Sequence, residues 1–294
     1  MKRKRIKIFD TVNVAVMCLV IVIMIFPLWY TIVGAFNEGY DYMRGGVYFW
    51  PRKFTLANFQ AVFLEDTLLQ AFLITIAKTV IGTVTSLFFT AWVSYGLTRP
   101  NLKGKKFYIP FMMFTMYFSG GMIPTFILVK DLGLFDSFWV YIIPSLFSVW
   151  NMVIMQSFIR ELPQALIESA KIDGASEYQV FFRIVLPMLK PVMAAVAMFT
   201  IVNQWNSYFD AMMYTNDVSL QPVQLFLQKM INDASASASI GSQAASAIPE
   251  AAKTITPQAI KFAAMTVTAV PIVCIYPFLQ KYFVKGMTIG AVKG

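Results

Sequence analysis

The segment 161–187 carries the residues best suited to specific chemistry, because it mixes charges with apolar anchors between two long apolar stretches. Good helix formers occupy 164–171 and begin just after Pro163. The pair Asp173-Gly174 is a strong turn signal, and helical spacing resumes over 175–185. We therefore predict two short helices joined by a bend.

This bent element would suit docking onto another protein. Ala170 and Ala175 would allow close packing, as would the rings of Phe181 and Phe182, and Glu168 would pair with a basic residue of a partner. An amphipathic helix that lies on lipid headgroups has a similar composition. Composition alone therefore leaves both interpretations open.

Composition excludes several classes of catalyst. The chain contains no histidine, which rules out a Ser-His-Asp triad, a Cys-His pair and an HExxH zinc site. Cys18 and Cys274 lie in apolar stretches near opposite ends of the chain and fit neither a metal site nor a disulfide framework. A Gly-x4-Gly-Lys-Ser/Thr phosphate loop does not occur, so ATP would have to bind to a separate protein.

The elements that position this segment are predicted to be membrane helices. The 294 residues are 58% hydrophobic and 13% charged, whereas soluble proteins carry about 25% charge. A helix needs about 20 apolar residues to cross a hydrocarbon layer of ~30 Å. Six windows are long enough and lie near 12–36, 68–97, 107–129, 138–158, 191–214 and 260–283. Because each is continuously apolar, we predict one all-α polytopic membrane domain that spans residues 1–294.

Basic residues orient this domain, because Lys and Arg are enriched on the cytoplasmic side of membrane proteins. The segment 1–7 is strongly basic, and placing it inside also makes 97–106, 159–190 and 284–294 cytoplasmic. Most of the Lys and Arg residues outside segment 1–7 then lie in these cytoplasmic segments or at their edges. Both termini are predicted to be cytoplasmic, and this topology accounts for the net charge of +9 without nucleic acid.

Two predicted external segments are longer than a tight connection. Residues 37–67 are long enough to form a short helix or a lid on the outer face. Residues 215–259 contain two runs rich in Ala and Ser, whose small side chains predict a flexible linker.

The spacing inside the cytoplasmic segment resembles the EAA signature of ATP-binding-cassette importer permeases, which is Glu-Ala-Ala-x3-Gly-x9-Ile-x-Leu-Pro. The matching residues are Glu168, Ser169, Ala170, Gly174, Ile184, Leu186 and Pro187. Only Ser169 departs from the signature, at a position where Ala is usual. The C-terminal run 276–294 is similar to the end of the LplC-type carbohydrate permeases, which are related to the maltose permease subunits. The resemblance extends over essentially the whole chain.

This resemblance implies a type I importer (MetI-like) permease fold with six transmembrane helices. It also implies that 161–187 is a coupling element that sits in a cleft of an ATPase subunit. The implied coupling residues are Glu168, Ser169, Ala170, Asp173, Gly174, Ala175, Phe181, Ile184, Leu186 and Pro187. The C-terminal tail is implied to reach between the ATPase subunits through Gly290, Val292, Lys293 and Gly294. A frayed terminus is the alternative interpretation of the tail.

The function implied by the resemblance is import of an oligosaccharide across the bacterial cytoplasmic membrane. The implied partners are a second homologous permease, two ATPase subunits that bind ATP and magnesium, and an extracellular or periplasmic solute-binding protein. No cofactor is expected in this chain. A membrane scaffold or sensor that recruits a partner through 161–187 without transport remains an alternative. A secondary transporter is less favoured, because the sequence has few buried carboxylates and no internal inverted repeat.

The fifth apolar window contains a polar and aromatic cluster that would line a substrate pathway. Its members are Asn203, Trp205, Asn206, Tyr208 and Asp210. Polar groups inside a membrane are costly, and they indicate either a function or helix–helix hydrogen bonds. Amides beside aromatic rings suit a sugar, but packing against the partner permease fits equally. In the second window, Lys78 is expected to snorkel toward the outer interface.

Overall fold

The computed structural model describes residues 2–64, 66–244 and 255–291. These residues are mostly helical, and the only β-type pairing among them is an isolated bridge between Asn37 and Phe54. The predicted all-α class is therefore confirmed. The chain divides into two compact units: unit 1 comprises Met1–Leu68 and Leu227–Val270, and unit 2 comprises Leu69–Phe226 and Pro271–Gly294.

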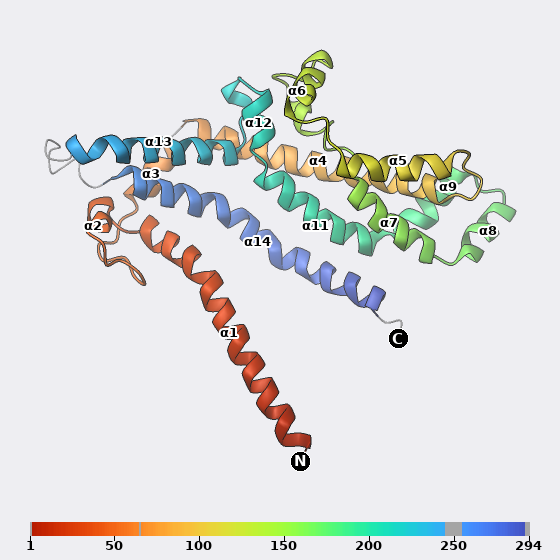
Figure 1. Ribbon diagram of the computed structural model, residues 1–294, viewed down its shortest axis with the longest axis horizontal. Coiled ribbons are helices and arrows are strands. Elements are labelled where there is room, and N and C mark those ends of the chain that lie inside the picture. Colours follow the sequence, from red (N-terminus) through yellow and green to blue (C-terminus); the bar gives the residue numbers. More distant parts are fainter. Residues whose placement is uncertain (1, 65, 245–254, 292–294) are drawn as a thin grey trace. The chain divides into compact units, whose positions relative to one another are not determined.

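Unit 1 begins with a long apolar helix, which Figure 1 shows to be uninterrupted. This helix, α1 (Lys2–Ala35), continues through Pro27, and its most apolar stretch is not buried at all within the protein. Prolines are tolerated in membrane helices because neighbouring groups satisfy the freed backbone. Two short helices, α2 (Gly39–Met43) and α3 (Ala57–Phe63), follow within the segment expected to form a short helix or lid.

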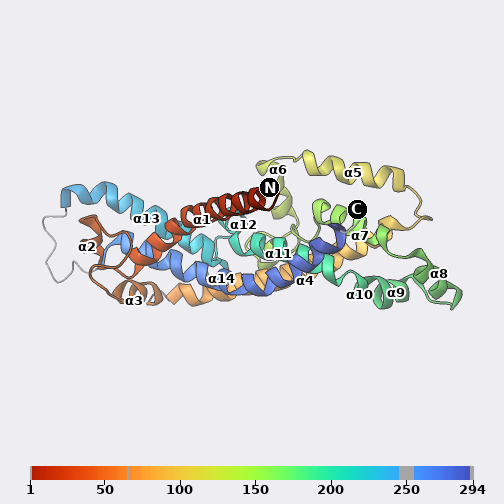
Figure 2. The ribbon, with the colours of Figure 1, turned by 90° about the horizontal axis from the view of Figure 1, so that it is seen from below.

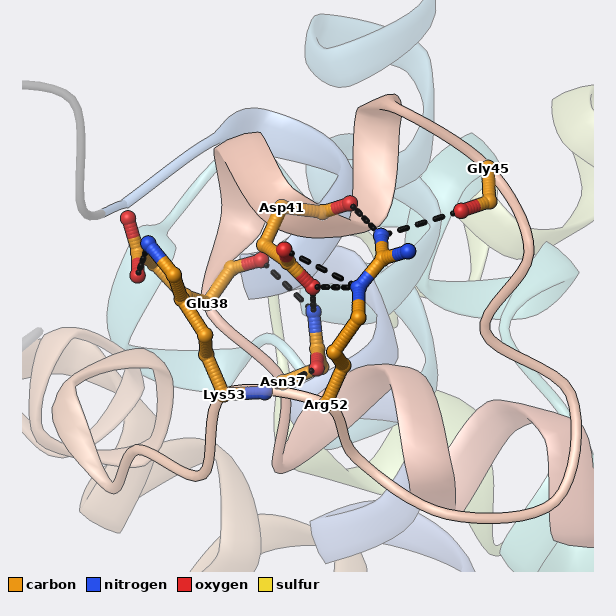
Figure 3. A network of polar contacts seen from close by, with 6 residues as sticks. All are labelled: Asn37, Glu38, Asp41, Gly45, Arg52 and Lys53. Atoms are coloured by element: carbon orange, nitrogen blue, oxygen red, sulfur yellow. Dashed lines mark hydrogen bonds and ion pairs between the residues drawn. The ribbon is translucent and has the colours of Figure 1, made fainter.

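A network of polar side chains holds the segment after α1 together (Figure 3). The Nε of Arg52 donates to Oδ2 of Asp41 at 2.9 Å, and Nδ2 of Asn37 donates to the same oxygen at 3.1 Å. Lys53 and Glu38 form an ion pair at 3.2 Å. Burial raises the pKa of Asp41, but the hydrogen bonds from Arg52 and Asn37 outweigh burial and hold this pKa below its ordinary value.

Unit 2 contains most of the helices. Its elements are α4 (Asp66–Thr98), whose first three residues belong to unit 1, α5 (Lys105–Tyr117), α6 (Met122–Asp131), the 3-10 helix η1 (Phe138–Tyr141), α7 (Val149–Glu161), α8 (Gln164–Ile172), α9 (Glu177–Val180), the π-helix η2 (Phe181–Val185), α10 (Leu186–Met188), α11 (Lys190–Asn206), α12 (Phe209–Tyr214) and the 3-10 helix η3 (Val218–Leu220). Two long helices, α13 (Val223–Ala244) and α14 (Pro257–Ala291), complete the chain and are divided between the units.

Three described helices are individually long and apolar enough to cross a membrane, over Phe9–Ala35, Thr67–Thr98 and Pro257–Cys274. The number rises to five if two bent pairs each count as one span, namely α5 with α6, bent by 116°, and Glu177–Met188 with α11, bent by 74°. The predicted windows are therefore apolar as expected, but not all of them are straight helices.

The window 138–158 shows why an apolar stretch need not be one helix. It contains η1, then irregular backbone, and then α7. Pro144 lies in the irregular part, where its missing N–H does not interrupt a helix. Ser148 then caps α7 by accepting a hydrogen bond from the Asn151 N–H at 3.3 Å. The prediction of a continuous helix across this window is wrong, because local capping chemistry overrides apolarity.

The prediction of a flexible linker across 215–259 is also wrong for the part that is described. Helix α13 includes the first Ala/Ser-rich run, Asp233 to Ser239, and ends at Ala244. Alanine has the highest intrinsic helix propensity, so alternating Ala and Ser can continue a helix that has already begun. Residues 245–254 lie outside the described residues.

Candidate functional site

The bend predicted near Asp173 is present and has a defined hydrogen-bond pattern. The Ala175 N–H donates to the Ala170 carbonyl at 2.9 Å, and the Gly174 N–H donates to the Lys171 carbonyl at 3.0 Å. These two bonds form the Schellman motif that commonly ends helices, with Gly174 at the left-handed position (φ 83°). Glycine adopts this conformation without steric cost. The bend therefore follows directly from the local sequence.

A capping box starts the second helix immediately after the bend. The Ser176 hydroxyl accepts from the Gln179 N–H, and the Gln179 side chain accepts from the Ser176 N–H at 2.8 Å. From there α9, η2 and α10 follow one another without a break. Figures 1 and 2 show α8 and α9 together at one end of unit 2, beyond α7. The prediction of two short helices with a bend is confirmed.

Helix α8 presents an exposed face that has apolar and charged groups. Ile172 is 86% exposed and Leu166 is 46% exposed, whereas Ile167 is buried and anchors the helix to unit 2. Glu168 is exposed and forms no ion pair with any other described residue. Ser169 and Asp173 are also exposed. We call Leu166, Glu168, Ser169, Ile172 and Asp173 the α8 face.

The opposite side of the bent element is packed against α4. Phe181 is only 2% exposed, and its ring centroid lies 5.1 Å from that of Trp92 and 5.3 Å from that of Tyr95. The expectation that Phe181 offers its ring to a partner is therefore wrong. Helical spacing places Phe181 on the same side as Val185, which is also fully buried.

The other residues predicted for docking or coupling differ in their exposure. Ala170, Ala175 and Leu186 pack against the same core as Phe181, and Ile184 is half-buried. Pro187 is exposed within the short helix α10. Phe182 is 44% exposed, and its ring lies 5.9 Å from that of Phe88. On α8, Glu168 and Ser169 therefore face outward, whereas Ala170 and Leu186 pack against the core.

Charged groups connect both sides of the bend to α4. The Tyr95 hydroxyl donates to Oε2 of Glu177 at 2.6 Å, and Lys171 pairs with the other oxygen of this carboxylate. The Arg99 guanidinium lies 4.3 Å from the centroid of the Tyr95 ring. Burial raises the pKa of Glu177, but the hydrogen bonds from Lys171 and Tyr95 and the positive charges of Lys171 and Arg99 together lower it below its usual value.

Trp92 and Tyr95 are site residues that the sequence analysis did not find. Together with Phe88 they place aromatic rings at positions i, i+4 and i+7, and this spacing puts them on one face of α4. That pattern was visible in the sequence. It did not reveal which segment would cover the face.

A polar cavity of about 400 Å³ lies elsewhere in unit 2. Its described lining comprises Ser86, Ser145, Phe147, Ser148, Trp150, Asn151, Phe199, Thr200, Asn203, Gln204, Ser207 and Asp210. Eight of these twelve residues carry a hydroxyl or amide group, and three carry aromatic rings. Asp210 is the only ionisable residue among those described in the lining.

The structure brings together only two of the five predicted pathway residues at this cavity, Asn203 and Asp210. Trp205 is 3% exposed inside the protein, and its Nε1 has no hydrogen-bond partner among the described groups. Asn206 accepts a hydrogen bond from Gln224 at 3.4 Å, and Tyr208 is 37% exposed. Ser86 and Ser145 also line the cavity but were not predicted, because an isolated serine in an apolar window carries no distinctive signal.

Lys78 is buried, which contradicts the expectation that it snorkels to an interface. Its Nζ donates to the carbonyl oxygen of Ser207 at 2.6 Å and to the hydroxyl of the same residue at 2.9 Å. It also lies 5.3 Å from the centroid of the Tyr141 ring. Acceptors on Ser207, the residue that follows α11, thus satisfy the ammonium inside the protein.

Of the predicted tail contacts, Gly290 lies in the last turn of α14, whereas Val292, Lys293 and Gly294 lie outside the described residues. Among the described residues, no cluster of potential metal ligands occurs.

Comparison with known proteins gives consistent matches. The family model of the binding-protein-dependent transport system inner membrane component matches residues 92–289. Protein LplC of Bacillus subtilis (strain 168) is 40% identical over 98% of this chain and 96% of its own length. The polygalacturonan/rhamnogalacturonan transport system permease protein YtcP of the same organism is 35% identical over 98% of this chain and 99% of its own length.

A solved structure also matches the fold. It is that of a bacterial ABC transporter involved in the import of the acidic polysaccharide alginate. One of its chains has a TM-score of 0.84 and 26% identity to this chain, over 94% of this chain and 97% of its own length.

Proposed function

The chain belongs to the family of binding-protein-dependent transport system inner membrane components, and we propose that it is a permease subunit that carries an oligosaccharide across the bacterial cytoplasmic membrane. The names of relatives support a saccharide substrate, because YtcP is a permease protein of a polygalacturonan/rhamnogalacturonan transport system and the matching structure is that of an ABC transporter involved in the import of alginate. Energy would come from ATP hydrolysis by separate subunits. The chain itself is a transport component and not an enzyme.

The single observation that carries this proposal is the two-sided geometry of the bent element. Its α8 face is exposed and unpaired, whereas Phe181 and Glu177 fix the following segment to α4. A partner that seats on α8 would therefore move a rigid unit and not a loose loop. Closure of the ATPase subunits would then shift α4 and α11 and open the permease toward the outside, as in other hinge and shear transitions.

The proposed assembly comprises this chain, a second homologous permease, two ATPase subunits and an extracellular or periplasmic solute-binding protein. ATP and magnesium would bind to the ATPase subunits. Both termini would be cytoplasmic, which places the α8 face on the ATPase side, as the distribution of Lys and Arg supports. The tail 290–294 would provide a second contact with these subunits.

The polar cavity is the proposed point of contact between this chain and the sugar. Asn203 and Asp210 offer hydrogen-bonding groups, and Trp150 and Phe199 offer aromatic faces that are more than half exposed. Sugars need both, because their hydroxyls form hydrogen bonds and their C–H faces stack on rings. Trp205 and Asn206 would instead contribute to packing within and around α11.

Reconstitution into vesicles tests this function. Vesicles that contain the chain with its co-purifying permease and ATPase should take up oligosaccharide only when ATP and the binding protein are both supplied. Uptake that needs no ATP and is abolished by an ionophore would support a secondary transporter instead. Recruitment of a cytoplasmic partner with no uptake under any condition would support the scaffold or sensor.

A further inference from the structure

Lys78 is a buried basic residue within an apolar helix. It lies on α4 in the first half of the apolar stretch Thr67–Thr98 and is 0% exposed within the protein. Burying an ammonium is costly unless acceptors and opposite charge compensate it. Ionisable residues inside membrane spans therefore usually serve a function. Lys78 has no part in the coupling geometry described above.

The acceptors of Lys78 lie at the point where α11 stops. Ser207 follows the last residue of α11 and has an extended backbone (φ −71°, ψ 124°). The carbonyl groups at the end of a helix carry partial negative charge, which a cation stabilises. Lys78 therefore caps α11 from a neighbouring helix, through contacts between residues 129 positions apart.

The same residue connects Lys78 to the polar cavity. Ser207 and Asp210 both line this cavity, whereas Lys78 is not among its described lining residues. Asp210 lies three residues after Ser207 and lines the same cavity wall, which brings its carboxylate toward the Lys78 ammonium, although the two side chains form no direct ion pair. Three residues before Ser207, Nε2 of Gln204 donates to Oγ of Ser145 at 2.8 Å and fixes the helix end to the cavity wall.

We propose that Lys78 is a positioning residue for the polar cavity, which holds the end of α11 through Ser207 and places a positive charge on the side of Asp210. The cavity then offers a surface rich in hydroxyl and amide groups whose single described carboxylate is balanced by a nearby ammonium, against which an oligosaccharide can slide. Without Lys78, the Asp210 carboxylate would be uncompensated in a region of low dielectric, where a charge interacts strongly with water and with any donor. This inference rests on the proposed function, since it takes the cavity to line the path of the sugar.

The test is second-site rescue, measured as ATP-driven oligosaccharide uptake by vesicles that contain the complete transporter. Lys78→Met should reduce uptake by on the order of tenfold, a size typical of strongly coupled neighbouring residues. Lys78→Arg, which keeps the charge, should retain most of the uptake. Combining Lys78→Met with Asp210→Asn should restore uptake to the level of Asp210→Asn alone. Lys130→Met, at an exposed lysine of α6, is the matched control.

Two results would overturn the inference: uptake by Lys78→Met equal to the unmodified transporter, or a double variant no better than Lys78→Met. If Lys78→Met fails to accumulate in the membrane, the double variant decides, because it should both accumulate and transport. If the proposed function itself is wrong, the outcome differs from both of these results, because the unmodified transporter would then show no ATP-driven uptake.

Discussion

Substitution of Gly174 probes whether the bend is fixed by backbone conformation or by contact with a partner. Gly174 has φ 83°, a conformation that costs an ordinary L-residue about 1–2 kcal/mol. No described atom lies within 4 Å of the position that a Cβ would occupy, so the chain itself has room for a side chain. The penalty for alanine is therefore almost entirely a backbone penalty.

A penalty of 1–2 kcal/mol changes the population of the bent form relative to any alternative by roughly 5- to 30-fold. We expect Gly174→Ala and Gly174→Leu to reduce coupled uptake by a similar factor within this range. Gly174→Asn should retain most of the activity, because asparagine tolerates the left-handed region while being about as large as leucine. The three variants thus separate backbone strain from side-chain size.

The assay is ATP-driven oligosaccharide uptake, normalised to the amount of assembled transporter in the vesicles. Equal losses for Gly174→Asn and Gly174→Leu with normal uptake for Gly174→Ala would refute the backbone explanation, and would mean that close approach of the partner requires a small residue. Normal uptake in all three variants would remove the bend from the coupling mechanism.

Three further predictions concern the same element. Phe181→Ala should destabilise the protein by roughly 3–5 kcal/mol in thermal unfolding in detergent, because it empties a buried aromatic site, and the partly exposed Phe182→Ala should cost much less. Glu168→Lys should abolish ATP-dependent uptake but leave the unfolding temperature unchanged, since the side chain is exposed and unpaired among the described residues; a fall in stability would contradict this. The folded pKa of Glu177 is below 4.5, so its stabilising contribution is present above pH 4.5 and is lost as the pH falls through the folded pKa. Glu177→Gln should therefore flatten the loss of thermal stability below pH 4.5, and an unchanged acid profile would argue against the ion pair.

The bend and the start of the second helix were predictable, because their causes are local. Asp173-Gly174 determines the turn, and Ser176 with Gln179 determines the cap, each within four residues of sequence. The apolar windows were predictable for the same reason, since length and composition are properties of a segment. The resemblance to the permease signature was visible for the same reason, because it needs only particular residue types at fixed spacing within one segment.

The orientation of Phe181 and the burial of Lys78 were not predictable, because both depend on distant parts of the chain. Phe181 is covered by Trp92 and Tyr95, and Lys78 is satisfied by Ser207. Neither partner is indicated by the sequence around the residue concerned. The cavity is a similar case, since its lining comes from three separate segments, at position 86, at 145–151 and at 199–210.

The central claim is that the α8 face contacts a separate ATPase subunit, and site-directed cross-linking tests it most directly. The experiment uses the complete transporter in membranes, with Cys18 and Cys274 replaced by alanine. Ile172→Cys then introduces a thiol on the α8 face, at a side chain that is 86% exposed, for modification with a photoactivatable reagent. The matched control is Leu132→Cys, which is 60% exposed at the end of α6 on the side predicted to be external.

Illumination should produce a cross-linked product between this chain and the ATPase subunit from the Ile172→Cys variant and none from the Leu132→Cys variant. If the ATPase subunit co-purifies with an efficiently labelled Ile172→Cys variant and no cross-link to it forms, the α8 face is not the coupling surface.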